Sequence, residues 1–317
     1  HVITYGWFNV SSVISDQWSG LDTLAVEDGG AEGVSLTCST SNIAICWITR
    51  ISSEPRFHLF QYTKSGFVEI ADWTTTKYAI FRTTWDYFEK FKDFFSWLEE
   101  TKYKTKFINS AEVISWNIDK NYLKNLAENG INIARTLFIE KADKVTLTQL
   151  FKRTKLPEAV IKPAISGAAR HTYHITVNNC TDYEKLFQKL IKEECMLFQE
   201  FMSNITSEGE ISLIMIGGKY THAVKKIAKK GDFRVQDDHG GSVRKYNASN
   251  KEILFARNCL KAIPFSPIYA RVDIVYDNKN KPSLSELELI EPELWFRNNP
   301  NSAEILAQEI FSLISPR

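Results

Sequence analysis

Four charged side chains near the C-terminal end alternate with apolar residues in two neighbouring segments. Arg271 and Asp273 lie in one segment, and Glu286 and Glu288 lie in the next. Successive side chains of a strand point to opposite faces, so each pair shares one face. If the segments pair as a hairpin, three carboxylates and one arginine converge, and carboxylates at that density repel one another without a cation. Their hard oxygens suit Mg²⁺. The two segments are therefore a candidate metal site, and a solvated acidic hairpin is the alternative.

A lysine near the end of a predicted buried strand precedes a loop of small residues. The strand covers residues 159–163, and Lys162 is its only charged residue. Small side chains let backbone N–H groups approach phosphate oxygens, and the lysine adds positive charge. No Gly-Lys-Ser/Thr follows, so this is not the P-loop pattern. The segment is a candidate phosphate-binding loop, and an ordinary surface turn is the alternative.

Two further segments could contact a nucleotide. Glu200, Phe201 and Met202 end a predicted strand, where backbone groups can meet an adenine edge. Residues 231–241 form a long polar stretch that ends in a glycine pair, a composition typical of an active-site cover. An ordinary strand end and an ordinary surface loop are the alternatives.

Predicted helices and strands position these segments. Helical periodicity or capping indicates helices over residues 88–101, 119–129, 146–154, 183–194, 250–263 and 303–313. Apolar runs indicate strands over residues 43–48, 57–62, 78–81, 159–163, 197–201, 211–216, 219–226, 269–276 and 283–290. Glycines 217–218 and the polar residues 277–280 suit hairpin turns. Antiparallel hairpins mixed with helices predict an α+β fold.

The order of these features resembles the ATP-grasp superfamily. One branch fits more closely, through Arg-Thr-Thr-Trp-Asp-Tyr at residues 82–87 and Glu-Leu-Glu-Leu-Ile-Glu-Pro at residues 286–292, together with residues 115–123, 221–226 and 231–236. These stretches resemble the RimK/glutathione-synthetase-like ATP-grasp proteins, the branch that includes the D-cycloserine-forming synthetase. The resemblance implies two α+β lobes that hold ATP between them, preceded by an α/β substrate domain. The implied bounds are residues 1–112 for the front domain, 113–195 for the central lobe and 196–317 for the C-terminal lobe.

The resemblance also implies a role for each matching residue. The set expected to hold the nucleotide is Lys120, Lys162, Ser166, Gly167, Ala168, Ala169, Glu200, Phe201, Met202, Glu210, Gly240 and Gly241, with Glu210 on the ribose. The set expected to act in catalysis is Arg271, Lys162 and Arg234. The set expected to bind Mg²⁺, or Mn²⁺ in its place, is Asp273, Glu286 and Glu288. The set expected to shape the substrate pocket is Arg82, Asp86 and Tyr87.

The implied reaction is an ATP-dependent joining of a carboxylate to a nitrogen nucleophile. An acyl phosphate would form on an amino-acid-like small molecule with release of ADP, and the nitrogen would then displace phosphate. The two reacting groups could sit on one molecule or on two. The rival interpretations are an ATP-binding interaction module without ligase activity and a phosphoryl transfer that stops before ligation. Residues 1–68 lack the opening strand and acidic turn expected for this branch, which leaves the substrate open.

Bulk composition is that of an ordinary globular protein. The 317 residues carry a formal net charge of +1, which gives no global field that would favour nucleic acid or an anionic membrane. No apolar run approaches the ~18 residues that span a bilayer. The five cysteines are odd in number and lack metal-type spacing, so free thiols in a reducing cytosol are expected. The sequence thus predicts a cytoplasmic protein with small-molecule partners, compatible with a homo-oligomer.

Overall fold

The front of the chain contains an antiparallel sheet. The computed structural model describes residues 73–75, 77–82, 87–167, 169–229, 231–235 and 240–314, and before them the backbone of four strands. These strands are β1 (Ala31–Cys38), β2 (Ile43–Ile51), β3 (Glu54–Thr63) and β4 (Gly66–Glu69), and they pair in sequence order. The strands predicted over residues 43–48 and 57–62 are confirmed as parts of β2 and β3.

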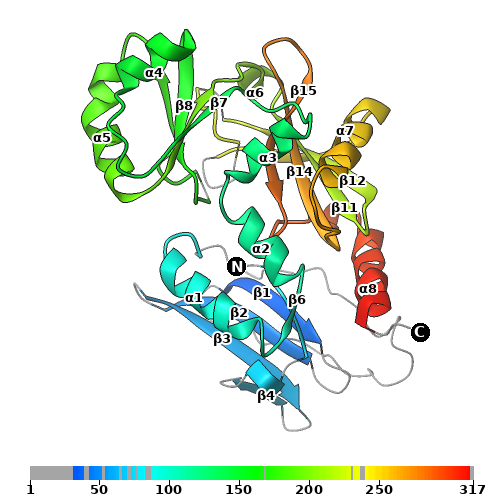
Figure 1. Ribbon diagram of the computed structural model, residues 1–317. Coiled ribbons are helices and arrows are strands. Elements are labelled where there is room, and N and C mark those ends of the chain that lie inside the picture. Colours follow the sequence, from blue (N-terminus) through cyan, green and yellow to red (C-terminus); the bar gives the residue numbers. More distant parts are fainter. Residues whose placement is uncertain are drawn as a thin grey trace.

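A small parallel unit connects the front of the chain to the rest (Figure 1). The 3₁₀ helix η2 (Trp73–Thr75) precedes β5 (Tyr78–Ile80), which pairs in parallel with β6 (Lys106–Ile108). The helix α1 (Phe91–Thr101) connects the two strands, and α2 (Ala111–Asn117) follows. An aromatic cluster around Phe81, Phe94 and Phe107 forms the core of this unit.

The central lobe is a four-stranded antiparallel sheet covered by two helices. Its strand order is β7 (Thr136–Ile139), β10 (Met196–Glu200), β8 (Glu158–Pro163) and β9 (Tyr173–Thr176). The helices are α4 (Leu147–Thr154) and α5 (Cys180–Glu193). Burial alternates along β8, so Ala159 and Ile161 enter the lobe's core while Lys162 faces the other way.

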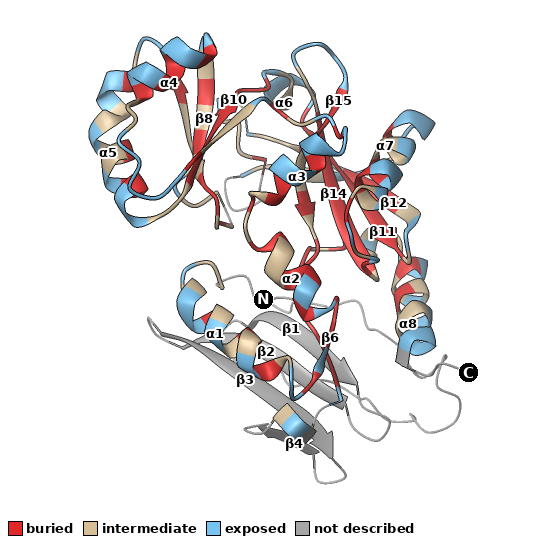
Figure 2. Cartoon of the chain, viewed as in Figure 1, coloured by how far each residue is buried: buried red, intermediate tan, exposed pale blue. Residues whose placement is uncertain are grey.

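The C-terminal lobe is a five-stranded antiparallel sheet. Its strand order is β13 (Ser242–Tyr246), β12 (Lys219–Ile227), β11 (Glu210–Ile216), β14 (Tyr269–Tyr276) and β15 (Pro282–Glu288). The helices of this region are α3 (Tyr122–Glu128), α6 (Asn204–Ser207), α7 (Asn250–Lys261) and α8 (Asn301–Ile314), with the 3₁₀ helix η4 (Phe296–Asn298) before α8. The two central strands β11 and β14 are buried almost throughout (Figure 2).

The two faces of this sheet carry different kinds of side chains. One face, with Leu213 and Val272, packs against α3 and α7 in the largest core. The other face carries apolar residues at one end, where Ile214 and Tyr269 pack with β5 and α8. Toward the other end of the same face, the residues of β14 become charged. Burial is therefore complete on one face, and a polar site lies on part of the other.

Most of the predicted elements are confirmed, and several bounds are corrected. The helix predicted over residues 119–129 is shorter, because Asp119 accepts a hydrogen bond from the N–H of Asn121 and Lys120 donates its own N–H to Ala164, so the helix begins at Tyr122. The helix predicted from residue 88 begins at Phe91. The α+β class is confirmed. Among the described residues no helix combines the length and apolar character needed to cross a membrane.

Candidate active site

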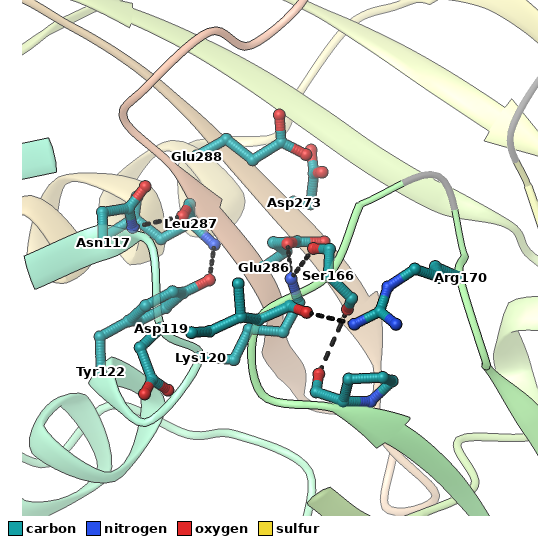
Figure 3. Close-up of polar contacts among 12 residues, drawn as sticks. Asn117, Asp119, Lys120, Tyr122, Ser166, Arg170, Asp273, Glu286, Leu287 and Glu288 are labelled. Atoms are coloured by element: carbon teal, nitrogen blue, oxygen red, sulfur yellow. Dashed lines mark hydrogen bonds and ion pairs between the residues drawn. The ribbon is translucent and has the colours of Figure 1, made fainter. Parts of the chain in front are cut away.

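The predicted charged hairpin is present. In the antiparallel pair β14–β15, Arg271 lies opposite Glu288 and Asp273 lies opposite Glu286. Asp273, Glu286 and Glu288 lie along one region of the sheet surface, beside Lys120 and Ser166 (Figure 3). A bulge follows Asp273, between the pairs of Asp273 and Ile274. The convergence predicted from strand alternation is therefore confirmed.

Each carboxylate of the hairpin is paired with a cation. Arg271 donates two parallel hydrogen bonds to Asp273, from Nε to Oδ1 at 3.0 Å and from Nη2 to Oδ2 at 2.8 Å, and it also pairs with Glu288. The ammonium of Lys120 lies 2.9 Å from Oε1 of Glu286. Among the described residues, no group of three or more His, Cys, Asp or Glu side chains is arranged so that it could hold a metal ion.

The electrostatics of the hairpin nevertheless suit a divalent cation. Burial raises the pKa of Glu288 to about 8, and the charges of Glu286 and Asp273 add to this although Arg271 opposes it. For Asp273, burial opposes ionisation, but Arg271 and Lys226 outweigh it and hold the pKa at about 2. Carboxylate oxygens from neighbouring strands, one of them kept protonated near neutral pH by its burial, fit the chemistry of an Mg²⁺ site.

A second buried ion pair adjoins the hairpin. Glu210 begins β11 and lies opposite Lys226 on β12, and the two side chains form an ion pair. Lys226 also lies 3.3 Å from Oδ2 of Asp273. The sequence reasoning missed Lys226, although its alternation along β12 could have placed it on this face. Here the carboxylate of Glu210 is engaged with Lys226, and its role at the ribose stays a prediction.

The small-residue loop lies against the same cluster. The ammonium of Lys120 donates to the carbonyl of Ser166 at 2.6 Å, which joins the loop to the hairpin (Figure 3). A Cβ at Gly167 would collide with the ring of Phe88, so a larger residue at this position would require that ring to shift. Burial lowers the pKa of Lys162, and the charge of Glu286 opposes that shift.

Other loop residues complete this part of the site. Ala169 adopts a positive φ of 55°. Arg170 donates to the carbonyl of Ile165 at 2.9 Å and pairs with Glu194, which fixes the turn. Ala168 lies outside the described residues.

The predicted adenine segment is an aromatic cluster. Phe201 and Met202 are buried, and the ring of His174 stacks on Phe201 with 3.9 Å between centroids. The ring of Phe233 meets both at their edges. Sequence reasoning missed His174 and Phe233, which come from β9 and from the polar loop. An apolar, aromatic environment at this strand end is compatible with a base.

The polar groups of this strand end are occupied by the β14–β15 turn. The amide of Asn278 donates to Oε1 of Glu200 at 2.9 Å and to the carbonyl of Phe201 at 3.0 Å. The turn thereby connects the two lobes at the predicted adenine segment.

The polar loop is described only in part. Arg234 forms a local pair with Asp232, with 2.7 Å between Nη2 and Oδ2. Hydrogen bonds from Arg234 hold the pKa of Asp232 well below its usual range. Gly240 has a positive φ of 78°, and Gly241 follows it, while residues 236–239 lie outside the described part. The covering role of Arg234 stays a prediction.

The predicted substrate residues lie beside the tail of the hairpin. The Cζ atom of Arg82 is 5.4 Å from the ring centroid of Tyr269, and its Nη2 donates to the carbonyl of Pro292 at 3.1 Å. Tyr87 hydrogen-bonds to the buried Glu291, a residue for which the sequence pattern predicted no role. Burial raises the pKa of Glu291 to about 7 although Arg271 and Arg82 oppose this. Asp86 lies outside the described residues.

Two stretches of the chain match families of known proteins. Residues 119–289 match the family described as RimK-like ATP-grasp domain, and residues 69–109 match the N-terminal domain of the D-cycloserine synthetase DcsG. The cycloserine biosynthesis protein DcsG of Streptomyces lavendulae is 23% identical over 77% of this chain and 86% of its own. A probable alpha-L-glutamate ligase of Shewanella loihica is 28% identical over 57% of this chain and 58% of its own.

A solved structure shares the fold. The crystal structure of D-cycloserine synthetase DcsG aligns with a TM-score of 0.70 at 22% identity, over 77% of this chain and 86% of that one. The matched family domain covers more than half of the chain and contains the lysines, the small-residue loop and the charged hairpin. The chain therefore belongs to the RimK-like ATP-grasp domain family and is an ATP-dependent carboxylate–amine ligase.

Proposed function

We propose that this ligase activates the carboxylate of an amino-acid-like small molecule as an acyl phosphate, with Mg²⁺ as the metal. One observation carries the proposal: Arg271 and Asp273 of β14 lie opposite Glu288 and Glu286 of β15 on one face of the sheet. Lys120 and Lys162 lie beside them. Two relatives support the substrate class, since one is named for cycloserine biosynthesis and the other as a glutamate ligase.

The nucleotide would lie between the two lobes. Lys120, Lys162 and the loop of residues 166–169 would contact its phosphates, since cations and small residues meet there. The strand end at residues 200–202 would hold the adenine, and Glu210 the ribose. The roles of Gly240, Gly241 and Arg234 in covering the site belong to the same proposal. Nucleotide binding would draw Lys120 from Glu286 toward phosphate and leave that carboxylate to the metal.

The metal would be held by Asp273, Glu286 and Glu288. When bound, Mg²⁺, or Mn²⁺ in its place, would offset negative charge on the triphosphate. Glu288 would then lose the proton that its raised pKa retains near neutral pH.

The reaction would proceed in two steps, formation of the acyl phosphate and its displacement by the nitrogen nucleophile. A carboxylate oxygen attacks the γ-phosphorus, the bond to the β-phosphate oxygen breaks, and ADP leaves. A nitrogen nucleophile then attacks the acyl carbon, phosphate leaves, and the nitrogen loses a proton. Arg271 and Lys162 offset the charge on the transferring phosphoryl oxygens, so positioning and electrostatics supply most of the catalysis.

The substrate pocket would include Arg82, Asp86 and Tyr87. The proposed domain bounds are residues 1–112, 113–195 and 196–317, and α2, which starts at Ala111, lies at the first boundary. We also propose a cytoplasmic location, on the cysteine usage alone.

A panel of amino acids and related carboxylic acids tests the proposal. With ATP and Mg²⁺, at least one acid should stimulate ADP release, hydroxylamine should trap a hydroxamate, and mass spectrometry should identify an amide or a ring as the product. ATP binding without acid-dependent ADP release would favour the interaction module. Phosphorylation without a trappable acyl group would favour a simple phosphoryl transfer.

A further inference from the structure

Two hydrogen-bond donors beside the active face have no partner within the described residues. They are Nε1 of Trp295 and Nη1 of Arg82, and both atoms are buried. Trp295 is only 4% exposed, so water has little access to its indole. Burying an N–H group without a partner is unfavourable, and each such group in a folded protein requires an explanation.

The two donors come from side chains that cover neighbouring positions of β14. The Cζ atom of Arg82 is 5.4 Å from the ring centroid of Tyr269, and the Cζ atom of Arg271 is 5.1 Å from that of Trp295. Tyr269 and Arg271 are two residues apart on one strand face, so they are separated by roughly 7 Å. The Cζ atom of Arg82 also lies 5.9 Å from the ring of Phe296, the residue that follows Trp295. The donors therefore belong to one neighbourhood.

Trp295 is tied to the cations of the proposed catalytic site. Its ring lies 5.1 Å from Cζ of Arg271 and 5.8 Å from Nζ of Lys226, and both of these groups contact Asp273. Its backbone adopts φ 41° and ψ 46°, a left-handed conformation that is unfavourable for a bulky residue. Such strain persists where the surroundings impose it, and it gathers at ligand sites.

We propose that Nε1 of Trp295 and Nη1 of Arg82 bind the carboxylate of the substrate that the enzyme phosphorylates. This inference rests on the proposed function, because that carboxylate must come close to Arg271. A guanidinium nitrogen and an indole N–H can each donate to one carboxylate oxygen. The other guanidinium nitrogen, Nη2, is held by Pro292, which leaves Nη1 for the ligand. The indole face meanwhile keeps Arg271 in position.

The first experiment separates the indole N–H from the indole ring. Trp295→Phe keeps an aromatic ring over Arg271 and removes the donor. With glycine, D- and L-alanine, D- and L-serine and L-glutamate as acids, we expect the KM for the stimulating acid to rise about tenfold or more, with the KM for ATP unchanged. Trp97→Phe, in the front aromatic cluster, is the matched control and should leave both values unchanged.

The second experiment observes the donor directly. In protein labelled with ¹⁵N-tryptophan, the indole resonance of Trp295 is identified by its loss in Trp295→Phe. It should shift when the stimulating acid is added, over the concentration range of the acid's KM. Arg82→Lys, which keeps the charge but not the two-nitrogen fork, should also raise the KM for the acid and should reduce that shift.

The outcomes distinguish this inference from the proposed function. The inference is overturned if an acid drives ADP release with the same KM in Trp295→Phe as in the wild-type enzyme. It is also overturned if that acid does not shift the Trp295 resonance. In both cases the proposed function stays intact. If none of the acids drives ADP release or moves the resonance, both are overturned.

Discussion

At the scale of single residues, the active face is a set of paired opposite charges. Arg271 is shared between Asp273 and Glu288, and Lys120 joins Glu286 to the loop at Ser166. The sequence predicted which side chains share the face, because alternation along a strand fixes direction. It could not predict which cation pairs with which carboxylate, because that depends on lysines from β12 and from the turn before α3.

Lys162 provides the simplest test of phosphate binding. Lys162→Ala should lower the rate of ADP release by at least about 100-fold, because a fixed positive charge beside the transferring phosphoryl group is lost. The measurement is a coupled ADP assay at saturating acid. Lys152→Ala, on the exposed side of α4, is the matched control. A normal rate of ADP release by Lys162→Ala would show that Lys162 does not contact the transferring phosphoryl group.

Glu288 provides a test of the metal. Glu288→Gln keeps the shape of the side chain but removes a charged oxygen ligand. The Mg²⁺ concentration for half-maximal ADP release should rise about tenfold or more, and Mn²⁺ should restore part of the activity. Glu304→Gln, at an exposed position of α8, should leave the titration unchanged. An unaltered Mg²⁺ requirement in Glu288→Gln would argue against Glu288 as a ligand.

The raised pKa of Glu291 predicts that the stability of the nucleotide-free protein depends on pH. Burial raises its pKa from 4.5 to about 7, so between these values the folded protein keeps a proton that the unfolded chain has released. Its contribution to stability is complete below about pH 4.5 and is lost as the pH rises through about 7. Glu291→Gln should flatten the fall of Tm from pH 5 to pH 8, by an amount that corresponds to roughly 3 kcal/mol at most. An equally steep fall in the variant would contradict the assignment, and Glu304→Gln should keep the steep profile.

At the scale of elements, the side chains of Asn117 and Tyr122 fix the strand that carries Glu286 and Glu288. The amide of Asn117, at the end of α2, donates to the carbonyl of Leu287 and accepts from the N–H of Leu289, both at 2.8 Å. It takes the place of a neighbouring strand at the edge of the sheet. The hydroxyl of Tyr122 accepts from the N–H of Leu287 at 2.9 Å. The position of Glu286 and Glu288 therefore depends on the turn between α2 and α3.

Asn117→Ala would leave two buried backbone groups without partners, the carbonyl of Leu287 in β15 and the N–H of Leu289 just after it. Each costs about 1–3 kcal/mol, so Tm should fall by several degrees. The rate of ADP release should fall as well, because Glu286 and Glu288 lose their support. Asn129→Ala, which removes an exposed hydrogen bond to Asn125, is the control for loss of an amide. A variant with wild-type Tm would show that β15 does not need this support.

The elements that sequence patterns predicted best are the long or strongly alternating ones. The strand Tyr269–Tyr276 and the turn at glycines 217–218 are as predicted, because pattern and turn chemistry agree there. The helix α2 was missed, since seven residues are too few to show a clear period. The strands β7 and β9, of four residues each, were missed for the same reason, and only tertiary pairing with β10 and β8 defines them.

At the scale of the whole molecule, the cores join regions that are distant in sequence. Leu197 of β10 and Ala164, which follows β8, pack in the core of the C-terminal lobe. Tyr78 and Ile80 of β5 pack against the charged sheet's apolar end together with Leu306 of α8. The sequence predicted the lobes but not these contacts, because apolar patterns do not specify their partners. The proposed nucleotide site is bordered by residues from both lobes.

A ligand held by both lobes should stabilise the folded chain as a whole. At about 100 times its Kd a ligand adds about 2.7 kcal/mol, which for a chain of this size corresponds to an increase in Tm of about 5 °C or more. A non-hydrolysable ATP analogue with Mg²⁺ should produce this shift in differential scanning fluorimetry. Chelation of Mg²⁺ should remove much of it, because the carboxylates of the hairpin then repel the triphosphate. Lys162→Ala should remove most of it, whereas Lys152→Ala should keep it. If the nucleotide raised Tm fully in both Lys162→Ala and the chelated protein, it would bind elsewhere. Neither Lys162 of the central lobe nor the carboxylates of the C-terminal lobe would then contribute to its binding.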